Sequence, residues 1–213
     1  MSAARPEIPM PPWRRFEDVL APPAHGQLID WVLSNRHRFS PSTVQFQGKP
    51  NLDRTKRVSE RLGDLGPCRT SLTERLSQML PDILAATGSK PFVPDHVELE
   101  IAAHGDGAFF SRHSDLPTGE ARAAAQNRFD RLVSAVYYFH CEPKSFTGGG
   151  LRLHRFGSDG TRAEDWVEVE PLQNSLVVFP SWALHEVRPV ACPSGRFEDY
   201  RFAVNIWLCR ESG

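Results

Sequence analysis

The sequence reads HVELEI from His96 to Ile101, where apolar side chains alternate with polar ones. A hydrophobic period of two residues is typical of a β-strand that buries one face. Several more strand-like runs follow, and turn residues such as those at Gly148-Gly149-Gly150 separate many of them. These runs cover residues 108–113, 131–141, 150–155, 165–170, 175–180, 185–190 and 199–208. Many short strands in series predict a sandwich or a jelly roll.

The chain before residue 95 has a helical character instead. Pro22-Pro23 precede an apolar run, which predicts a first helix that begins on proline. Thr70-Ser71 followed by Glu74 form a capping box, which predicts the start of a second helix. Pro81 should kink or break that helix. We therefore expect early helices to pack on the outer face of one sheet of a mainly β fold.

The length of 213 residues predicts one structural domain with three parts. Residues 1–12 are expected to be a disordered lead, residues 13–94 a helical annex, and residues 95–213 the β core. Within the annex, residues 42–62 carry five basic side chains among turn-forming residues, which fits either a solvated surface loop or a mobile lid over a site. Residues 116–130 are a second candidate flap.

Composition and charge bear on the partners and the cellular compartment of the protein. The formal net charge is −1, so no global electrostatic argument favours nucleic acid or membrane as a partner. No apolar run reaches the length of a membrane-spanning helix, and Met1–Trp13 does not resemble a secretory signal. The four cysteines are widely spaced and are expected to be free thiols in a reducing compartment, which favours the cytoplasm. The sequence does not indicate an oligomeric state.

Candidate metal ligands appear as His113-Ser114-Asp115, followed much later by His185 and then by Arg201. His-x-Asp places two ligands on the same side of an extended segment, because strand side chains alternate. Two imidazoles and one carboxylate suit Fe(II) and leave other coordination positions open. A guanidinium is a planar fork that grips a carboxylate through two hydrogen bonds. Each part alone also fits a surface loop or a packed core residue; the ordered set favours a metal site. The remaining histidines, His104 among them, match no such pattern and are expected on the surface or in the core.

The sequence around these residues resembles the iron- and 2-oxoglutarate-dependent dioxygenases of the prolyl 4-hydroxylase type. The resemblance runs from about Val97 to Arg210. It implies a double-stranded β-helix, or jelly roll, with the N-terminal helices on one sheet. It also implies Fe(II), the cosubstrate 2-oxoglutarate and O2, with ascorbate as a candidate reductant. The matching blocks are Gly107–Asp115, Arg131–Phe139, Thr147–Leu153, Leu184–Val187 and Tyr200–Trp207.

The resemblance also implies a role for individual residues. His113, Asp115 and His185 match the iron ligands. Arg201 and Tyr138 match the pair that binds the far carboxylate of 2-oxoglutarate. The positions that line the substrate side in the oxygen-sensing branch of the family are matched by Arg131 and Trp207, and by Phe110 where that branch has tyrosine.

Two hydroxyl groups of that branch are missing from this chain. Phe110 stands three residues before the first ligand, and Ala103 stands ten residues before it, where the branch has tyrosine at both positions. The substrate and the strength of 2-oxoglutarate binding are therefore expected to differ from those of the oxygen-sensing enzymes.

The resemblance implies an enzyme that hydroxylates an aliphatic carbon, and Asp115 argues against a halogenase, which needs a small residue there. The expected substrate is a prolyl or other amino-acid residue in a peptide or protein. A free amino acid or small metabolite is the alternative. A nucleic-acid demethylase is less favoured, because Trp207 stands where those enzymes have a second arginine. A non-catalytic jelly-roll binding module and a zinc hydrolase are further alternatives; the latter lacks an evident general base.

Overall fold

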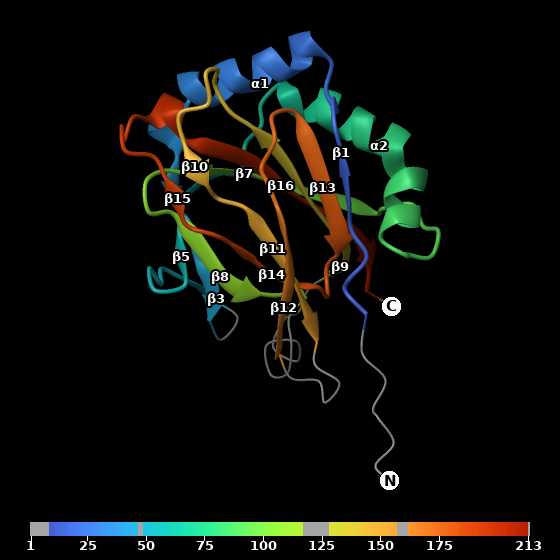
Figure 1. Ribbon diagram of the computed structural model, residues 1–213. Coiled ribbons are helices and arrows are strands. Elements are labelled where there is room, and N and C mark those ends of the chain that lie inside the picture. Colours follow the sequence, from blue (N-terminus) through green and yellow to red (C-terminus); the bar gives the residue numbers. More distant parts are fainter. Residues whose placement is uncertain (1–8, 47–48, 117–127, 157–161, 213) are drawn as a thin grey trace.

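The computed structural model describes residues 9–46, 49–116, 128–156 and 162–212. Most of the predicted lead at 1–12 and of the predicted flap at 116–130 therefore lies outside the described residues. Within them, two antiparallel sheets pack face to face, and two helices cover the larger one (Figure 1). The prediction of a mainly β fold with helices on one sheet is confirmed.

The larger sheet has seven strands and the smaller sheet has five. In spatial order the larger sheet contains β1 (Arg14–Phe16), β13 (Ser175–Pro180), β9 (Phe129–Phe139), β16 (Arg201–Glu211), β7 (His96–His104), β6 (Glu60–Leu62) and β2 (Ser40–Pro41). The smaller contains β12 (Arg162–Val169), β11 (Leu151–Phe156), β14 (Leu184–Val187), β8 (Phe109–His113) and β5 (Arg57–Val58). Two short pairs join β10 (Thr147–Gly148) to β15 (Val190–Ala191) and β3 (Val44–Phe46) to β4 (Lys49–Asn51).

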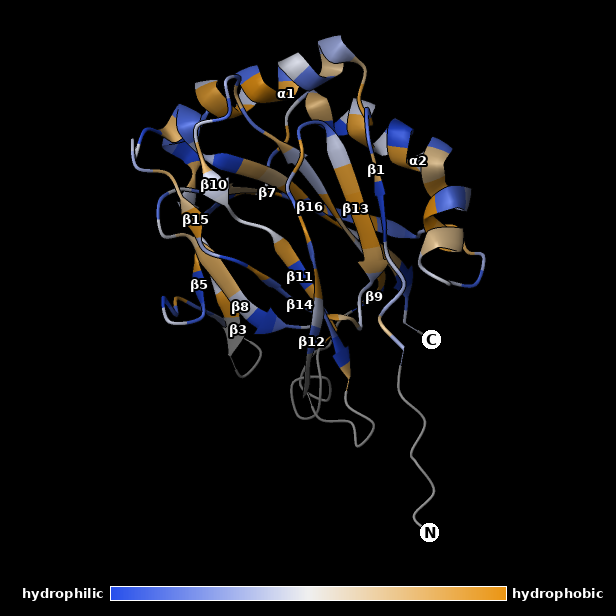
Figure 2. Ribbon diagram, viewed as in Figure 1, coloured by the Kyte–Doolittle hydropathy of each residue, from blue (hydrophilic) through white to orange (hydrophobic). Residues whose placement is uncertain are grey.

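The central strands of the larger sheet are apolar on both faces, and each face packs against a different partner. The outward face meets the helices α1 (Pro22–Ser34) and α2 (Cys68–Ala86) in one apolar cluster, and Figure 2 shows apolar residues along β13 and in alternating stretches of both helices. The inward face meets the smaller sheet in a second cluster. From the larger sheet the outward residues include Tyr137, Phe139, Leu176, Val178, Phe202 and Val204, and the inward ones Tyr138, Val177, Phe179 and Ala203.

This alternation has a consequence for polar side chains. Strand residues that share the inward face with the second cluster point into the space between the two sheets. On β16 the inward positions include Arg201, which is buried, and on β9 they include Ser134. Polar groups in such a space need partners or a ligand, since burial without a hydrogen bond costs free energy. The fold therefore concentrates its chemistry between the sheets.

The first helix begins at Pro22, as predicted. The capping-box prediction is wrong, because α2 already begins at Cys68 and its side chains supply no cap hydrogen bond. A turn brings the Cys68 amide to the Leu65 carbonyl, so the helix starts before the Thr-Ser pair. The helix also runs on past Pro81 without the predicted break. Pro81 is on the exposed face, where water can bind the carbonyl that it leaves free.

The basic segment at 42–62 is more regular than a surface loop. β5 pairs with β8 in the smaller sheet, and β6 pairs with β7 in the larger sheet. Strands from before residue 95 therefore extend both sheets. The predicted division into an annex before residue 95 and a β core after it stays a prediction. The side chain of Arg57 is only 11% exposed, unlike a residue of a solvated loop.

Other elements are short. The chain has 3-10 turns at Arg36–Arg38 and Phe197–Asp199. All four cysteines are free thiols, as predicted. Among the described residues, we find no helix with the length and apolar character needed to cross a bilayer.

Candidate metal and cosubstrate site

The three predicted metal ligands meet at one end of the space between the sheets. His113 is the last residue of β8, and Asp115 follows two residues later. β14 lies beside β8 and places His185 opposite His113 in the strand register. The topology of the smaller sheet therefore brings together ligands that are far apart in the sequence.

The ligand atoms of these three residues converge. Their candidate donor atoms all lie within 4.8 Å of one another. Asp115 Oδ1 lies 3.8 Å from His113 Nε2, and Asp115 Oδ2 lies 3.7 Å from His185 Nε2. These separations are too long for hydrogen bonds. The three side chains thus present ligand atoms that converge without forming hydrogen bonds to one another. This arrangement fits a metal ion placed among them.

The backbone fixes both histidines in the tautomer that a metal needs. His113 Nδ1 lies 2.8 Å from the Ser111 carbonyl oxygen, and His185 Nδ1 lies 2.9 Å from the Ala183 carbonyl oxygen. A carbonyl can only accept, so each Nδ1 carries a proton, and in the neutral form of the ring Nε2 keeps its lone pair. Burial, helped by the neighbouring His185, lowers the pKa of His113 to about 3. The imidazole is therefore neutral and able to bind a metal at neutral pH.

Asp115 is held from behind by two serines. Ser134 Oγ donates a hydrogen bond of 2.6 Å to Asp115 Oδ2, and Ser181 Oγ lies 2.9 Å from Ser134 Oγ. The Asp115 amide also donates to the Ser181 carbonyl oxygen at 3.1 Å. Burial by itself would raise the pKa of Asp115, but the two histidines and the Ser134 and Trp207 side chains outweigh it, so the pKa is lowered. The carboxylate is therefore charged and oriented.

Ser134→Ala should weaken metal binding about 10- to 100-fold, because partners that orient a metal ligand typically contribute that much. The variant should fold normally, since the change removes a single oxygen atom from a small side chain. Calorimetric titration of Mn(II) into the metal-free protein measures the affinity. Ser145→Ala is the control, because Ser145 is exposed, does not line the cavity and donates its hydroxyl to the Pro143 carbonyl oxygen in a turn. Unchanged Mn(II) affinity in Ser134→Ala would show that Ser134 does not support the ligand.

Arg201, on β16, is a buried guanidinium without an acidic partner. Its side chain is 1% exposed, and it forms no ion pair with any described residue. Its Nη1 donates to His104 Nδ1 at 3.1 Å, and its guanidinium lies 4.8 Å from the centre of the Tyr138 ring. Gly149 allows this placement, because a Cβ there would lie 2.6 Å from Arg201 Cδ.

Two polar atoms beside this guanidinium also lack partners. Arg201 Nε and Tyr138 Oη are buried and form no hydrogen bond to a described residue. Burial lowers the pKa of Arg201, whereas Tyr138 acts to raise it. A buried positive charge with free donors is costly unless an anion binds it. The pair that the resemblance implied for a carboxylate therefore does lie together in the cavity, and the described residues place no acidic side chain against it.

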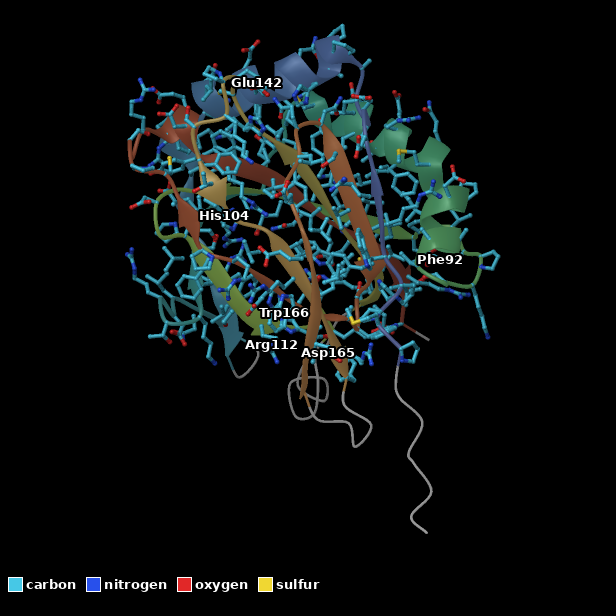
Figure 3. The ribbon with its side chains drawn as sticks, in the orientation of Figure 1. Phe92, His104, Arg112, Glu142, Asp165 and Trp166 are labelled. Carbon is cyan, nitrogen blue, oxygen red and sulfur yellow. The ribbon has the colours of Figure 1, made fainter. Side chains whose placement is uncertain are left out.

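His104, which is labelled in Figure 3, is buried and lines this pocket, although we expected it to be a surface or core residue. Burial and the nearby Arg201 and Arg57 lower its pKa well below the usual value, so the ring is neutral. Its Nδ1 accepts the Arg201 hydrogen bond, which leaves the ring proton on Nε2. The sequence signal was weak: His104 shares its strand face with Ala102 and Glu100, and neither suggests a site.

The predicted substrate-side residues separate into two groups. Phe110 and Trp207 line the same cavity as the three ligands and Arg201. Phe110 stacks on His113, with ring centres 3.6 Å apart and an interplanar angle of 19°. Arg131 instead stacks on Trp207 at 3.9 Å and forms an ion pair with Glu98, behind the cavity wall. The role of all three stays a prediction.

The cavity also includes a residue that the sequence did not single out by itself. Arg57, one of the basic residues of the predicted lid, lines it from β5. The strand register places Arg57 opposite Phe110 on β8. The pairing of β5 with β8 is a long-range contact, which is why spacing along the chain gave no signal for it.

Comparison with known proteins shows the family to which the chain belongs. Residues 99–209 match the model of the 2OG-Fe(II) oxygenase superfamily. An uncharacterised PKHD-type hydroxylase of Synechocystis sp. is 36% identical over 196 residues, which cover 91% of this chain. The match spans only 61% of that relative, so this chain corresponds to part of its length.

Solved structures share the fold. A prolyl-4-hydroxylase of Pseudomonas putida superposes with a TM-score of 0.59 at 24% identity, over 95% of this chain and 94% of that one. A prolyl hydroxylase of Trichoplax adhaerens, in complex with a hypoxia inducible factor peptide fragment, gives 0.66 at 20% identity, over 92% and 83%. The double-stranded β-helix is therefore confirmed. Because the family model covers more than half of the sequence, the chain belongs to the 2OG-Fe(II) oxygenase superfamily, whose members use Fe(II), 2-oxoglutarate and O2.

Proposed function

We propose that this protein is a dioxygenase that uses Fe(II) and 2-oxoglutarate to hydroxylate an aliphatic carbon. The observation that supports this most is the buried Arg201 guanidinium, which has no acidic partner among the described residues and shares a cavity with three convergent metal-ligand side chains. His113, Asp115 and His185 would hold the iron. Arg201 and Tyr138 would bind the far carboxylate of 2-oxoglutarate.

The residues of the chain provide position and surroundings for the reaction. Bound iron and 2-oxoglutarate supply the activation of O2 and the oxidising power. The carbonyls of Ser111 and Ala183 keep both histidines oriented, and Ser134 does the same for Asp115. Apolar walls, which include Phe179, keep water away from the reacting groups.

A prolyl or other amino-acid residue in a peptide or protein is the proposed substrate. Phe110 and Trp207 offer aromatic surfaces beside the metal ligands, against which an aliphatic ring could pack. A free amino acid or a small metabolite is the alternative within the same chemistry. Because the ligand set contains Asp115 rather than a small residue, hydroxylation is favoured over halogenation. The four free cysteines favour the cytoplasm as the compartment.

A product screen tests this function. Purified protein would be incubated with Fe(II), ascorbate and 2-oxoglutarate, together with amino acids, peptides and metabolite extracts. We expect succinate release that depends on a substrate, and a product heavier by one oxygen atom in mass spectrometry. A zinc hydrolase would instead work without 2-oxoglutarate, and a binding module would release no succinate with any substrate. Either result, together with failure to bind 2-oxoglutarate, would contradict the proposal.

A further inference from the structure

Arg57 brings a second guanidinium to the cavity, from the sheet opposite to that of Arg201. Arg57 is on β5 of the smaller sheet, whereas Arg201 is on β16 of the larger one. The Arg57 guanidinium lies 4.8 Å from the centre of the Phe110 ring. Phe110 in turn stacks on the metal-ligand candidate His113. The guanidinium is therefore separated from this ligand by a single aromatic ring.

The orientation of Arg57 is fixed by several contacts. Its Nε donates to Ser59 Oγ at 3.1 Å, its Nη1 donates to the Thr43 carbonyl oxygen at 3.5 Å, and its Nη2 donates to Glu100 Oε1 at 3.2 Å. Ser59 Oγ is itself bonded to Ser42 Oγ at 2.9 Å. A guanidinium has five N–H donors, so these three contacts leave one N–H on Nη1 and one on Nη2 for a ligand. A fixed fork of this kind loses little entropy when it binds a carboxylate.

Charge is not balanced around Arg57. Glu100 pairs with Arg57 through one oxygen and with Arg61, at 3.1 Å, through the other. Together with Asp115 and Arg201, the charged groups that the structure describes in this region comprise three guanidiniums and two carboxylates. A divalent metal would add two positive charges and 2-oxoglutarate would remove two. One positive charge would then remain beside the place where the substrate binds.

We propose that Arg57 binds a carboxylate of the substrate, so that the substrate carries an anionic group close to the carbon that reacts. This inference rests on the proposed function and names the chemistry of its substrate. The carboxylate belongs either to a free amino acid or peptide C-terminus, or to an acidic side chain next to the modified residue. The competing interpretation is that Arg57 only pairs with Glu100 and supports the fold.

Matched pairs of probes test the inference. The pairs are L-proline with L-prolinamide, glycyl-L-proline with its amide, and a blocked Glu-Pro peptide with its Gln-Pro counterpart. Each would be titrated calorimetrically into protein that holds 2-oxoglutarate and Mn(II), which replaces Fe(II) and prevents turnover. We expect the carboxylated member of at least one pair to bind roughly 10-fold or more tightly than its neutral partner. The pair that responds identifies the source of the carboxylate.

Variants separate binding from structural support. Arg57→Met should remove the preference for the carboxylate, and Arg57→Lys should keep part of it. Arg61→Gln is the matched control, because Arg61 shares Glu100 but does not line the cavity. It should keep the preference. Thermal unfolding and 2-oxoglutarate titration of each variant establish that the fold and the cosubstrate site remain intact.

Three results would overturn the inference. The wild-type protein could bind no carboxylate more tightly than its amide, Arg57→Met could keep the full preference, or Arg61→Gln could lose as much as Arg57→Met. If Arg57→Met does not fold, the wild-type comparison and the partial loss expected in Arg57→Lys together test the inference. Failure of the proposed function would look different, because 2-oxoglutarate itself would then fail to bind the wild-type protein.

Discussion

Asp115→Ala should lower metal affinity more than about 100-fold and abolish hydroxylation, while the fold remains intact. Asp115 is the only anionic side chain in the ligand set, and its loss leaves two imidazoles to hold a divalent cation. Because even partners that only orient a ligand contribute 10- to 100-fold, the loss of a charged ligand should exceed that range. Calorimetric titration of Mn(II) gives the affinity, and succinate release with substrate gives the activity.

Two further variants make this test specific. Asp115→Asn keeps the size of the side chain and an oxygen that can accept from Ser134, so it isolates the effect of the charge. It should lose most of the affinity as well. Asp82→Ala, on the exposed face of α2, is the control for loss of a carboxylate elsewhere and should behave like the wild-type protein. Wild-type turnover by Asp115→Ala would mean that the metal site is not at these three residues.

The parts of the site that could be predicted from the sequence are those that depend on local geometry. Alternation along 96–101 gave a strand, and His-x-Asp placed two ligands on one side of an extended segment. The distant ligand His185 became recognisable only through the order of motifs that a family shares. Its physical neighbour in the fold, His113, follows from the pairing of β14 with β8, which no local pattern contains.

The residues that the sequence did not reveal depend on tertiary contacts. Arg57 looked like a member of a solvated basic stretch, and only the pairing of β5 with β8 places it at the cavity. His104 looked like any histidine on an apolar strand, and only its contact with Arg201 gives it a place in the site. The start of α2 was misplaced for a related reason, because a turn at Leu65–Cys68 begins the helix before the capping-box residues are reached. A local sequence pattern does not show which contacts its residues will make in the folded protein. Where those contacts favour a different structure, a prediction from the pattern fails.

The missing hydroxyls at Phe110 and Ala103 can be reconsidered with the structure in view. The Phe110 ring stacks on His113, and the Arg57 guanidinium also lies against the Phe110 ring. Phe110 therefore contributes packing at this position, where a tyrosine would contribute a hydrogen bond. Ala103 is buried on the other face of its sheet, in the apolar cluster beneath the helices, and does not line this cavity. At the position of Phe110 the cavity therefore has a guanidinium, that of Arg57, in place of a phenol hydroxyl. Among the polar side chains of the cavity, we therefore expect replacement of Arg201 to affect cosubstrate binding most.

Arg201→Lys should weaken 2-oxoglutarate binding by roughly 10- to 100-fold, the range expected for the loss of a charge-assisted hydrogen bond. An ammonium group is a point charge and cannot reproduce the two parallel hydrogen bonds of a guanidinium. Tyr138→Phe should have a milder effect of roughly 2- to 10-fold, since it removes one neutral donor. Calorimetric titration of 2-oxoglutarate into the Mn(II)-loaded protein measures each affinity.

The control for this prediction is on the same strand. Arg210→Lys makes the same chemical change at the exposed end of β16, and it should leave 2-oxoglutarate binding unchanged. Mn(II) affinity should also be unchanged in Arg201→Lys, because Arg201 contacts none of the three ligand side chains through a hydrogen bond or ion pair in the described residues. A separation of this kind, with metal binding kept and cosubstrate binding lost, follows from two sites that share a cavity but use different side chains. If Arg201→Lys kept wild-type affinity for 2-oxoglutarate, the cosubstrate would have to bind elsewhere, and the buried guanidinium would need another anion to explain it.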